Sequence, residues 1–139
     1  MDKKNGAGLI IAVVFIIIAI AFVAMRLQAP TEGPALMISN FEFSEVQNGS
    51  ATFLVSGTGS TATFEGPIQK PTPCHTLSAT YGTVDNDVVV DITAASDPGT
   101  ICIQVIAETF YRGSFEFSRT MDEVIVNYRG QELGRQNFA

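Results

Sequence analysis

Few side chains in this chain could do chemistry, and the first is the single histidine, His75, in the segment PTPCHT. Nucleophilic catalysis requires a histidine beside a nucleophile, with a third group to orient its ring. His75 instead follows a proline-stiffened loop that enters a predicted strand, so we expect its ring to form a local hydrogen bond. The motifs G-x-S-x-G, G-x-G-x-x-G, C-x-x-C and H-E-x-x-H are absent. We therefore predict that the chain is not an enzyme and has no catalytic residue and no cofactor.

The two cysteines, Cys74 and Cys102, are the next candidates. In an oxidising compartment, two cysteines of a small domain are expected to pair. Such a bridge would close a loop of about 28 residues and stabilise the fold by roughly 3–4 kcal/mol through chain entropy. Two free buried thiols are the alternative. A metal site is disfavoured because two cysteines and one histidine supply too few ligands.

The densest group of carboxylates comprises Asp85, Asp87, Asp91 and Asp97. A calcium site needs several carboxylates on one tight loop that contains a glycine. Here Asn86 and Asp87 resemble a hairpin turn, and Asp91 falls inside a predicted strand. We interpret the group as a solvated acidic edge, which also discourages pairing with other chains.

Asn48 begins the triplet Asn48-Gly49-Ser50, which matches the acceptor pattern for N-glycosylation. Asn-Gly is also the dipeptide most typical of a tight β-hairpin turn. Both interpretations are compatible with an exposed position, so Asn48 is a candidate glycosylation site within a predicted hairpin.

The elements that position these residues follow a long apolar segment. Residues 6–25 are twenty consecutive positions without a charged or polar side chain, about the length of a helix that crosses a ~30 Å hydrocarbon layer. Lys3 and Lys4 precede the segment and only Arg26 follows it closely, so the positive-inside rule places the N-terminus in the cytoplasm. We predict a single-pass membrane protein with an extracytoplasmic C-terminal part.

Two alternatives to a retained anchor stay open. The triplet Ala19-Ile20-Ala21 resembles a signal-peptide cleavage site, although it lies inside the apolar run. A pilin-like helix that packs into a filament core is the second alternative. We divide the chain into a cytoplasmic stub (1–5), a transmembrane helix (6–25), a linker (26–35) and an extracytoplasmic domain (36–139).

The charge of the extracytoplasmic part excludes some partners. Residues 26–139 carry six bases and thirteen acids, a net charge of −7. Nucleic-acid binding needs a basic surface, and adhesion to anionic lipid needs one as well. We therefore expect no nucleic-acid partner. The expected partners are the membrane and another envelope or cell-surface protein.

Alternating apolar residues and turn signals predict short strands after residue 35. The expected strands are 36–46, 50–57, 60–66, 74–82, 87–96, 100–110, 112–118, 122–130 and 131–138. No helical pattern of useful length occurs there. We predict an all-β domain, an immunoglobulin-like β-sandwich of seven to nine strands, with a small barrel as the alternative.

The same alternation predicts where the cysteines point. Ile101, Ile103 and Val105 would share the inner face of one strand, which turns Cys102 to the outer face. The pattern Leu77, Ala79, Tyr81 likewise turns Cys74 outward. We expect a disulfide on the outer face of a sheet, bridging two strands or a strand and the PTPC loop.

The segments PTPCHTL, VVVDI and DPGTICIQVI together resemble small membrane-anchored β-sandwich proteins of prokaryotic, including archaeal, envelopes. The resemblance covers about a quarter of the chain and implies a Cys74–Cys102 disulfide but no activity. A weaker likeness exists to β-sandwich protease inhibitors. The layout of one helix and an exterior sandwich also looks like that of archaellum stator subunits and archaeal pilins.

Two functions of different classes follow as expectations. An interaction or structural module of the envelope would present loops or an edge strand, and residues 57–66 are the expected edge. An inhibitor of an exported protease would instead insert the loop 66–73, which carries Lys70 and is stiffened by prolines. Lys70 and His75 are the residues that we expect to face a partner.

Overall fold

The computed structural model describes residues 35–139. The predicted stub, the apolar segment 6–25 and the linker up to residue 34 lie outside the described residues. Between Ala35 and Ala139 the structure contains no helix that is long and apolar enough to span a membrane.

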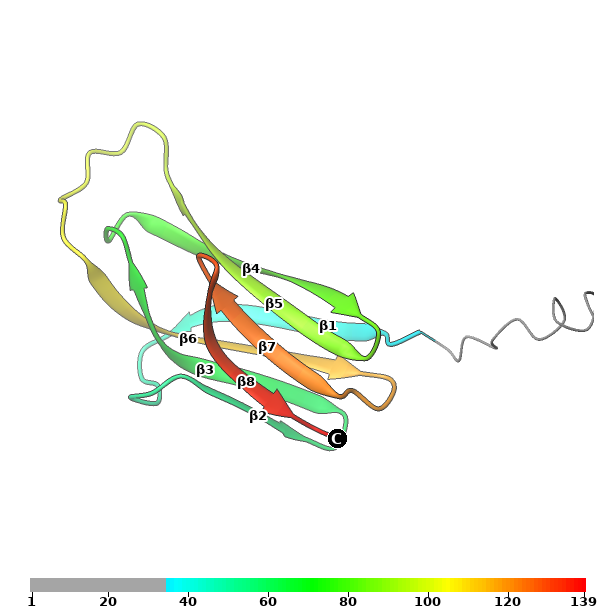
Figure 1. Cartoon of the computed structure of the whole chain (residues 1–139). Helices are drawn as coiled ribbons and strands as arrows, with labels where there is room; N and C mark the ends of the chain where they lie inside the picture. The colour runs from blue at the N-terminus through cyan, green and yellow to red at the C-terminus, as the bar shows by residue number, and fades with distance from the viewer. Residues whose placement is uncertain (1–34) are drawn as a thin grey trace, which may run out of the picture. The chain divides into compact units, whose positions relative to one another are not determined.

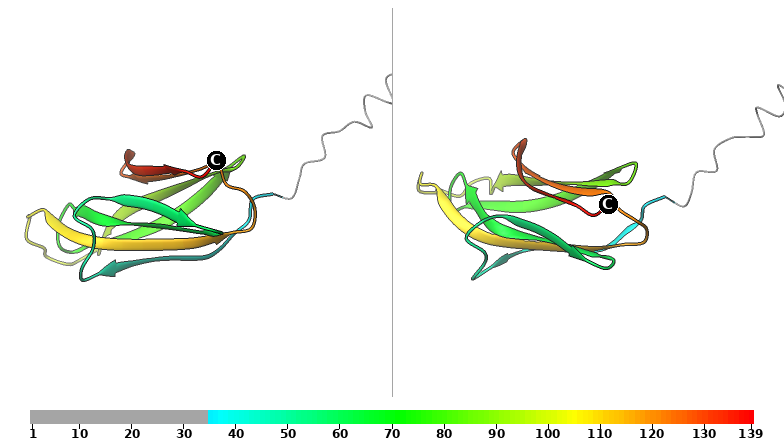
Figure 2. Two further views of the ribbon diagram at one scale, coloured as in Figure 1. Left: turned by 90° about the horizontal axis from the view of Figure 1, so that it is seen from below. Right: turned by 60° about the horizontal axis from the view of Figure 1, so that its bottom comes forward.

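The described residues form eight strands, labelled in Figure 1. These strands are β1 (Ile38–Val46), β2 (Leu54–Thr58), β3 (Thr61–Lys70), β4 (His75–Val84), β5 (Asp87–Ser96), β6 (Ala107–Phe117), β7 (Glu123–Tyr128) and β8 (Gln131–Asn137). They make two four-stranded sheets, one in the order β1-β6-β3-β2 and the other in the order β4-β5-β7-β8. Figure 2 shows the two sheets as separate layers. The predicted all-β sandwich is therefore confirmed at the level of two packed sheets.

The core forms where the alternating apolar residues of the two sheets meet. Val88, Val90 and Ile92 of β5 are almost completely buried, as the pattern predicted. They face the β3 and β6 side chains Phe64 and Phe115, which are equally buried. Burial of this kind, at about 25 cal/mol per Å² of apolar surface, is the main stabilising contribution to the domain.

The two long sides of the sandwich differ. On one side, β2 of the first sheet lies against β8 of the second. On the other side are the edge strands β1 and β4, where the rings of Phe41 and Tyr81 lie 4.9 Å apart between their centroids. Tyr81 is nevertheless 44% exposed, so this side is the more open one.

The two ends of the sandwich also differ in the connections that they contain, and we name them the entry end and the distal end. The entry end contains Ala35, the β4–β5 turn and the β6–β7 connection, since Ile38 pairs with Phe117 at the end of β6. The distal end contains the β3–β4 and β5–β6 connections, because His75 pairs with Ser96 there. Both of these connections cross from one sheet to the other.

Two strand predictions are wrong. The segment 100–106 belongs to no strand, and one strand, β6, covers 107–117 where two were expected. The predicted Asn48-Gly49 hairpin is also absent, because β1 and β2 lie at opposite edges of their sheet. Neither residue of that dipeptide has the positive φ that a type I′ turn requires. The turn between β7 and β8 contains Arg129 and Gly130, with φ values of 53° and 78°.

Candidate functional site

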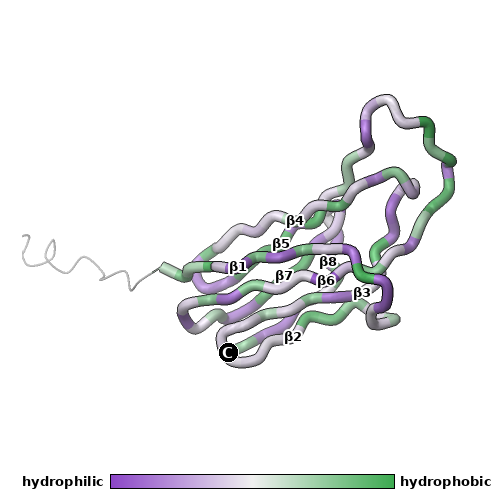
Figure 3. The backbone as a smooth tube through the Cα atoms, turned by 180° about the vertical axis from the view of Figure 1, so that it is seen from behind, coloured by the Kyte–Doolittle hydropathy of each residue, from purple (hydrophilic) through white to green (hydrophobic). Residues whose placement is uncertain are grey.

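The most unusual surface of the domain is the connection between β5 and β6, residues 97–106, which we name the distal loop. Four large aliphatic side chains on it are exposed: Ile101 (100%), Ile103 (69%), Val105 (50%) and Ile106 (73%). Figure 3 shows this loop extending beyond the strands, with its apolar stretch in green. Single exposed apolar residues are ordinary, but a cluster on one loop is typical of a surface that a partner covers.

The distal loop is held to the sandwich by the predicted disulfide. Cys102 in this loop bonds to Cys74 in the β3–β4 connection, with the two Cα atoms 6.0 Å apart. Cys74 itself lies in a tight turn, which is closed by a hydrogen bond of 3.2 Å from the His75 amide to the Thr72 carbonyl. The His75 ring makes the expected local hydrogen bond, 2.8 Å from Nδ1 to the Thr72 hydroxyl. The bridge therefore anchors an exposed apolar loop to a rigid turn.

The expected position of the disulfide on an outer sheet face is wrong. The alternation of Ile101, Ile103 and Val105 would turn Cys102 to an outer sheet face only if these residues formed a strand. They belong to no strand. Cys74 also precedes the first residue of β4. The bridge joins two loops at the distal end and lies on neither face of a sheet.

A groove adjoins the distal loop, with a cavity volume of about 590 Å³. Ile106 lines it from the loop side, and Pro71, Tyr128 and Leu133 contribute further apolar surface. The Tyr128 hydroxyl donates to the Gln69 carbonyl at 2.9 Å and so links β7 to β3 across the groove. Burial raises the pKa of Tyr128 above its ordinary value of 10.0. We name this feature the distal groove.

Lys70 is not on an exposed loop. The segment 66–73 is predicted from its prolines to be a loop or a strand edge. Residues 66–70 are an edge, because they belong to β3 and pair with β6 alone, whereas residues 71–74 connect β3 to β4. The inserted loop that an inhibitor would need is therefore shorter than expected. The Lys70 side chain is buried, and its Nζ lies 3.7 Å from a Glu45 carboxylate oxygen. Glu45 also accepts a hydrogen bond from the Tyr111 hydroxyl, and burial raises the pKa of Tyr111. The protease-inhibitor hypothesis therefore loses the exposed lysine on which it depended.

The expected edge at residues 57–66 is only partly correct. Residues 54–58 form β2, which is an edge strand, but residues 61–65 of β3 pair with both β2 and β6. Asn48 is exposed in the connection between β1 and β2, so its glycosylation stays a prediction.

The acidic residues do not converge. Asp91 accepts a hydrogen bond from Asn127 at 3.3 Å, and Asp122 accepts one from Asn86 at 3.4 Å. Within residues 35–139 no three His, Cys, Asp or Glu side chains are grouped so that they could hold a metal ion.

Sequence reasoning missed the distal loop because its alternating isoleucines look like a buried strand. The signals that could have found it are the Asp97-Pro98-Gly99 turn, which ends β5, and the cysteine in the middle of the loop. The candidate site is thus the exposed apolar surface made by the distal loop, its disulfide and the distal groove. No family model matches the chain, and no curated protein and no solved structure matches it either.

Proposed function

We propose that the chain is a single-pass membrane protein whose C-terminal sandwich, of immunoglobulin-like type, is an interaction module for another protein of the cell envelope or cell surface. The observation that carries the proposal is the apolar distal loop, in which Ile101 is completely exposed. Leaving several aliphatic side chains in water forgoes about 1.5–3 kcal/mol each relative to burial, which a bound partner would recover.

The way the distal loop is held supports binding. Its disulfide to Cys74 limits the conformations of the loop, and a segment that is already ordered loses less entropy when it binds. The distal groove next to Ile106 offers a concave surface for a side chain of the partner. The described part of the chain begins at the opposite end of the sandwich, where Ile38 pairs with Phe117.

Site-specific crosslinking tests the binding surface. A photoreactive phenylalanine analogue replaces Ile103 in the distal loop, and the matched control replaces Val84, which is 62% exposed at the entry end. When the full chain is crosslinked in its own cells, we expect an adduct with one other envelope or surface protein at position 103 and no adduct with another protein at position 84. The adduct should disappear when Ile101→Asp is added. Equal labelling at both positions, or none at either, would contradict the proposal.

The mass of the extracted protein tests the anchor. The run of twenty uncharged residues at 6–25 and the position of Ala19-Ile20-Ala21 inside that run favour retention of the segment. Intact-mass measurement on detergent-extracted protein should give the chain with its N-terminal segment and with no free thiol. A mass that begins near residue 22 would indicate cleavage and overturn this part of the proposal.

A further inference from the structure

The edge of β4 is the longest regular edge in the described part of the chain. The two sheets of residues 35–139 end in four edge strands, β1, β2, β4 and β8. β4 has ten residues and pairs with β5 without a register shift from His75 to Val84. Its sequence, HTLSATYGTV, contains no Asp, Glu, Lys, Arg or Pro. An edge of this kind exposes unpaired backbone groups that can accept another strand.

The other three edges each carry a feature that opposes pairing. β1 has a register shift beside Asn40, whose φ is 52°, and carries Glu42 and Glu45. β8 also has a register shift, beside Glu132, and is charged. β2 has five residues and lies against β8. The contrast singles out β4 as the edge that is open to a partner.

We propose that β4 pairs antiparallel with β4 of a second copy of this chain, about a two-fold axis through Ala79. Strand pairing about a two-fold axis must be antiparallel and must join the same surface of both copies. Side chains directly opposite each other in an antiparallel pair point to the same face of the sheet. When the axis passes between the two Ala79 residues, each inner-face residue is therefore opposite an inner-face residue of the second copy. The two sheets then form one continuous sheet whose inner faces lie on the same side. The register sets Ser78 opposite Thr80 of the second copy and Leu77 opposite Tyr81 of the second copy.

The side chains suit this pairing. Ser78 and Thr80 are exposed on the outer face, where hydroxyl side chains opposite each other are favourable cross-strand neighbours. On the inner face, the exposed ring of Tyr81 would lie beside the buried Leu77 of the second copy, an aromatic–aliphatic pair that removes apolar surface from water. The pairing therefore covers the more open long side of the sandwich.

Charge favours a second copy at this edge over the edges of β1 and β8, which both carry acidic residues. Residues 35–139 carry five bases and twelve acids, a net charge of −7, so two copies repel wherever acidic surfaces meet. β4 has no charged residue, and the nearest acid along its middle, Asp91, belongs to β5. Asp91 and its equivalent would be three strand spacings apart, about 14 Å, which exceeds the screening length of about 8 Å at physiological salt.

Antiparallel pairing points the two Ala35 residues in opposite directions along the dimer. The full chain in detergent micelles is the appropriate sample, because no shared bilayer then restricts the two anchors. Sedimentation analysis should show a dimer, and S78K/T80K should raise the dimer dissociation constant at least tenfold, since lysines then face lysines across the axis. The control T93K/A95K adds the same charge at exposed positions of β5, one strand behind the edge, and should change the constant less than about twofold.

Cysteine pairs test the register. Under mild oxidation, a mixture of the S78C chain and the T80C chain should form a disulfide between copies. A mixture of S78C and T76C should not, because position 76 of the second copy is displaced by four residues, about 13 Å, from the residue opposite Ser78. Circular dichroism and thermal unfolding confirm that each variant is folded. A monomeric wild-type chain at about 100 μM, an S78K/T80K chain that dimerises like the wild type, or equal crosslinking in both mixtures would each overturn the proposal.

Discussion

Cys74 and Cys102 join two connections that both cross between the sheets at the distal end of the sandwich, with their Cα atoms 6.0 Å apart. Cys74 follows β3 of one sheet, and Cys102 follows β5 of the other. The bridge therefore ties the two layers together at the place where an exposed apolar loop leaves the core. We therefore expect this one covalent bond to affect both the stability of the domain and the proposed binding surface.

The first prediction concerns the energetic contribution of this bond. The variant C74A/C102A should lower the free energy of unfolding by about 2–5 kcal/mol, the usual range for a native disulfide of a small domain. The loss arises mainly in the unfolded chain, because the cysteines lie outside the buried core. Urea unfolding of the oxidised wild type and of the double variant measures the difference. Equal unfolding midpoints would contradict this prediction and would mean that the bridge restrains the distal loop without stabilising the fold.

The second prediction contrasts two isoleucines with the same local pattern. Ile92 of β5 is 1% exposed and Ile101 of the distal loop is completely exposed. Ile92→Ala should cost about 2–5 kcal/mol through lost burial and a cavity, whereas Ile101→Ala should change stability by less than about 0.5 kcal/mol. Thermal unfolding of the two variants under identical conditions gives the comparison. A large loss at position 101 would mean that this segment packs as a strand after all.

These isoleucines also explain how far sequence reasoning reaches. The alternation of Val88, Val90 and Ile92 located β5 at its observed bounds, because successive side chains of a strand point to opposite faces and only one face of β5 packs in the core. The alternation of Ile101 and Ile103 is equally regular, yet it marks a crossover between sheets. The alternation describes only the order of apolar and polar side chains within a segment. It does not show whether neighbouring strands are available to pair with that segment.

Strand order is the second property that the sequence did not reveal. Asn48-Gly49 predicts a hairpin from local turn chemistry, but β1 pairs with β6, which lies more than fifty residues away in sequence. The position of Lys70 depends on the same long-range order, because Glu45 of β1 reaches it across β6. The disulfide was predictable from composition, while the loop that it holds required the topology.

The third prediction concerns Gly113 in the centre of β6. A Cβ atom at this position would overlap the ring of Phe64, which is almost completely buried and packed on all sides. Gly113→Ala should therefore cost about 1–3 kcal/mol through overpacking. The matched control is Gly82→Ala in β4, where a Cβ atom would meet no atom within 4 Å, and where a change of less than about 0.5 kcal/mol is expected. Denaturant unfolding of both variants tests the difference, and equal stability would mean that the Phe64 ring can move aside.

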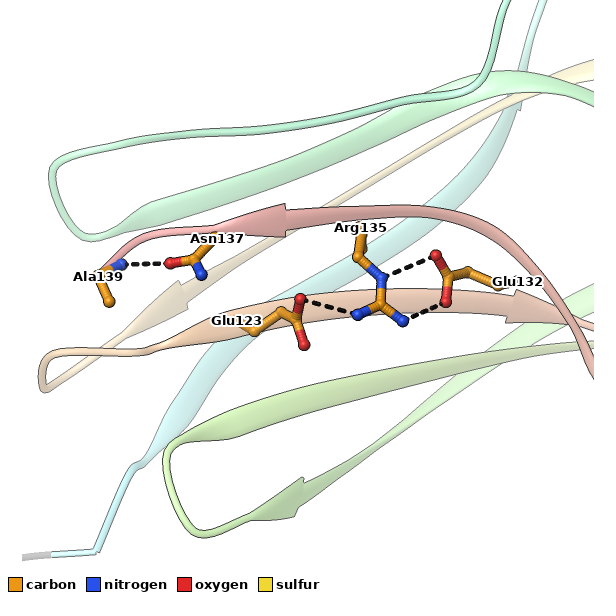
Figure 4. A network of polar contacts seen from close by, with 5 residues as sticks. All are labelled: Glu123, Glu132, Arg135, Asn137 and Ala139. Carbon is orange, nitrogen blue, oxygen red and sulfur yellow. Dashed lines mark hydrogen bonds and ion pairs between the residues drawn. The ribbon is translucent and has the colours of Figure 1, made fainter.

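The fourth prediction concerns an ion-pair network that joins β7 and β8, drawn in Figure 4. Arg135 donates to both carboxylate oxygens of Glu132, at 2.8 Å and 2.6 Å, and to Glu123 at 3.2 Å. The hydrogen bonds that Glu132 accepts from Arg135 lower the pKa of Glu132. The network lies on the surface, so its contribution is small and is screened by salt.

The lowered pKa gives the network a defined pH dependence. A carboxylate whose pKa is lower in the folded state stabilises the protein above its unfolded pKa of about 4.3, and this contribution is lost as the pH falls through the folded value. Between about pH 5 and pH 3 the wild type should therefore lose more stability than Glu132→Gln, which has no carboxylate to protonate at this position. Glu108→Gln removes the same charge without touching Arg135 and serves as the control. Thermal midpoints measured across this range at low salt test the prediction, and parallel curves for the wild type and Glu132→Gln would contradict it.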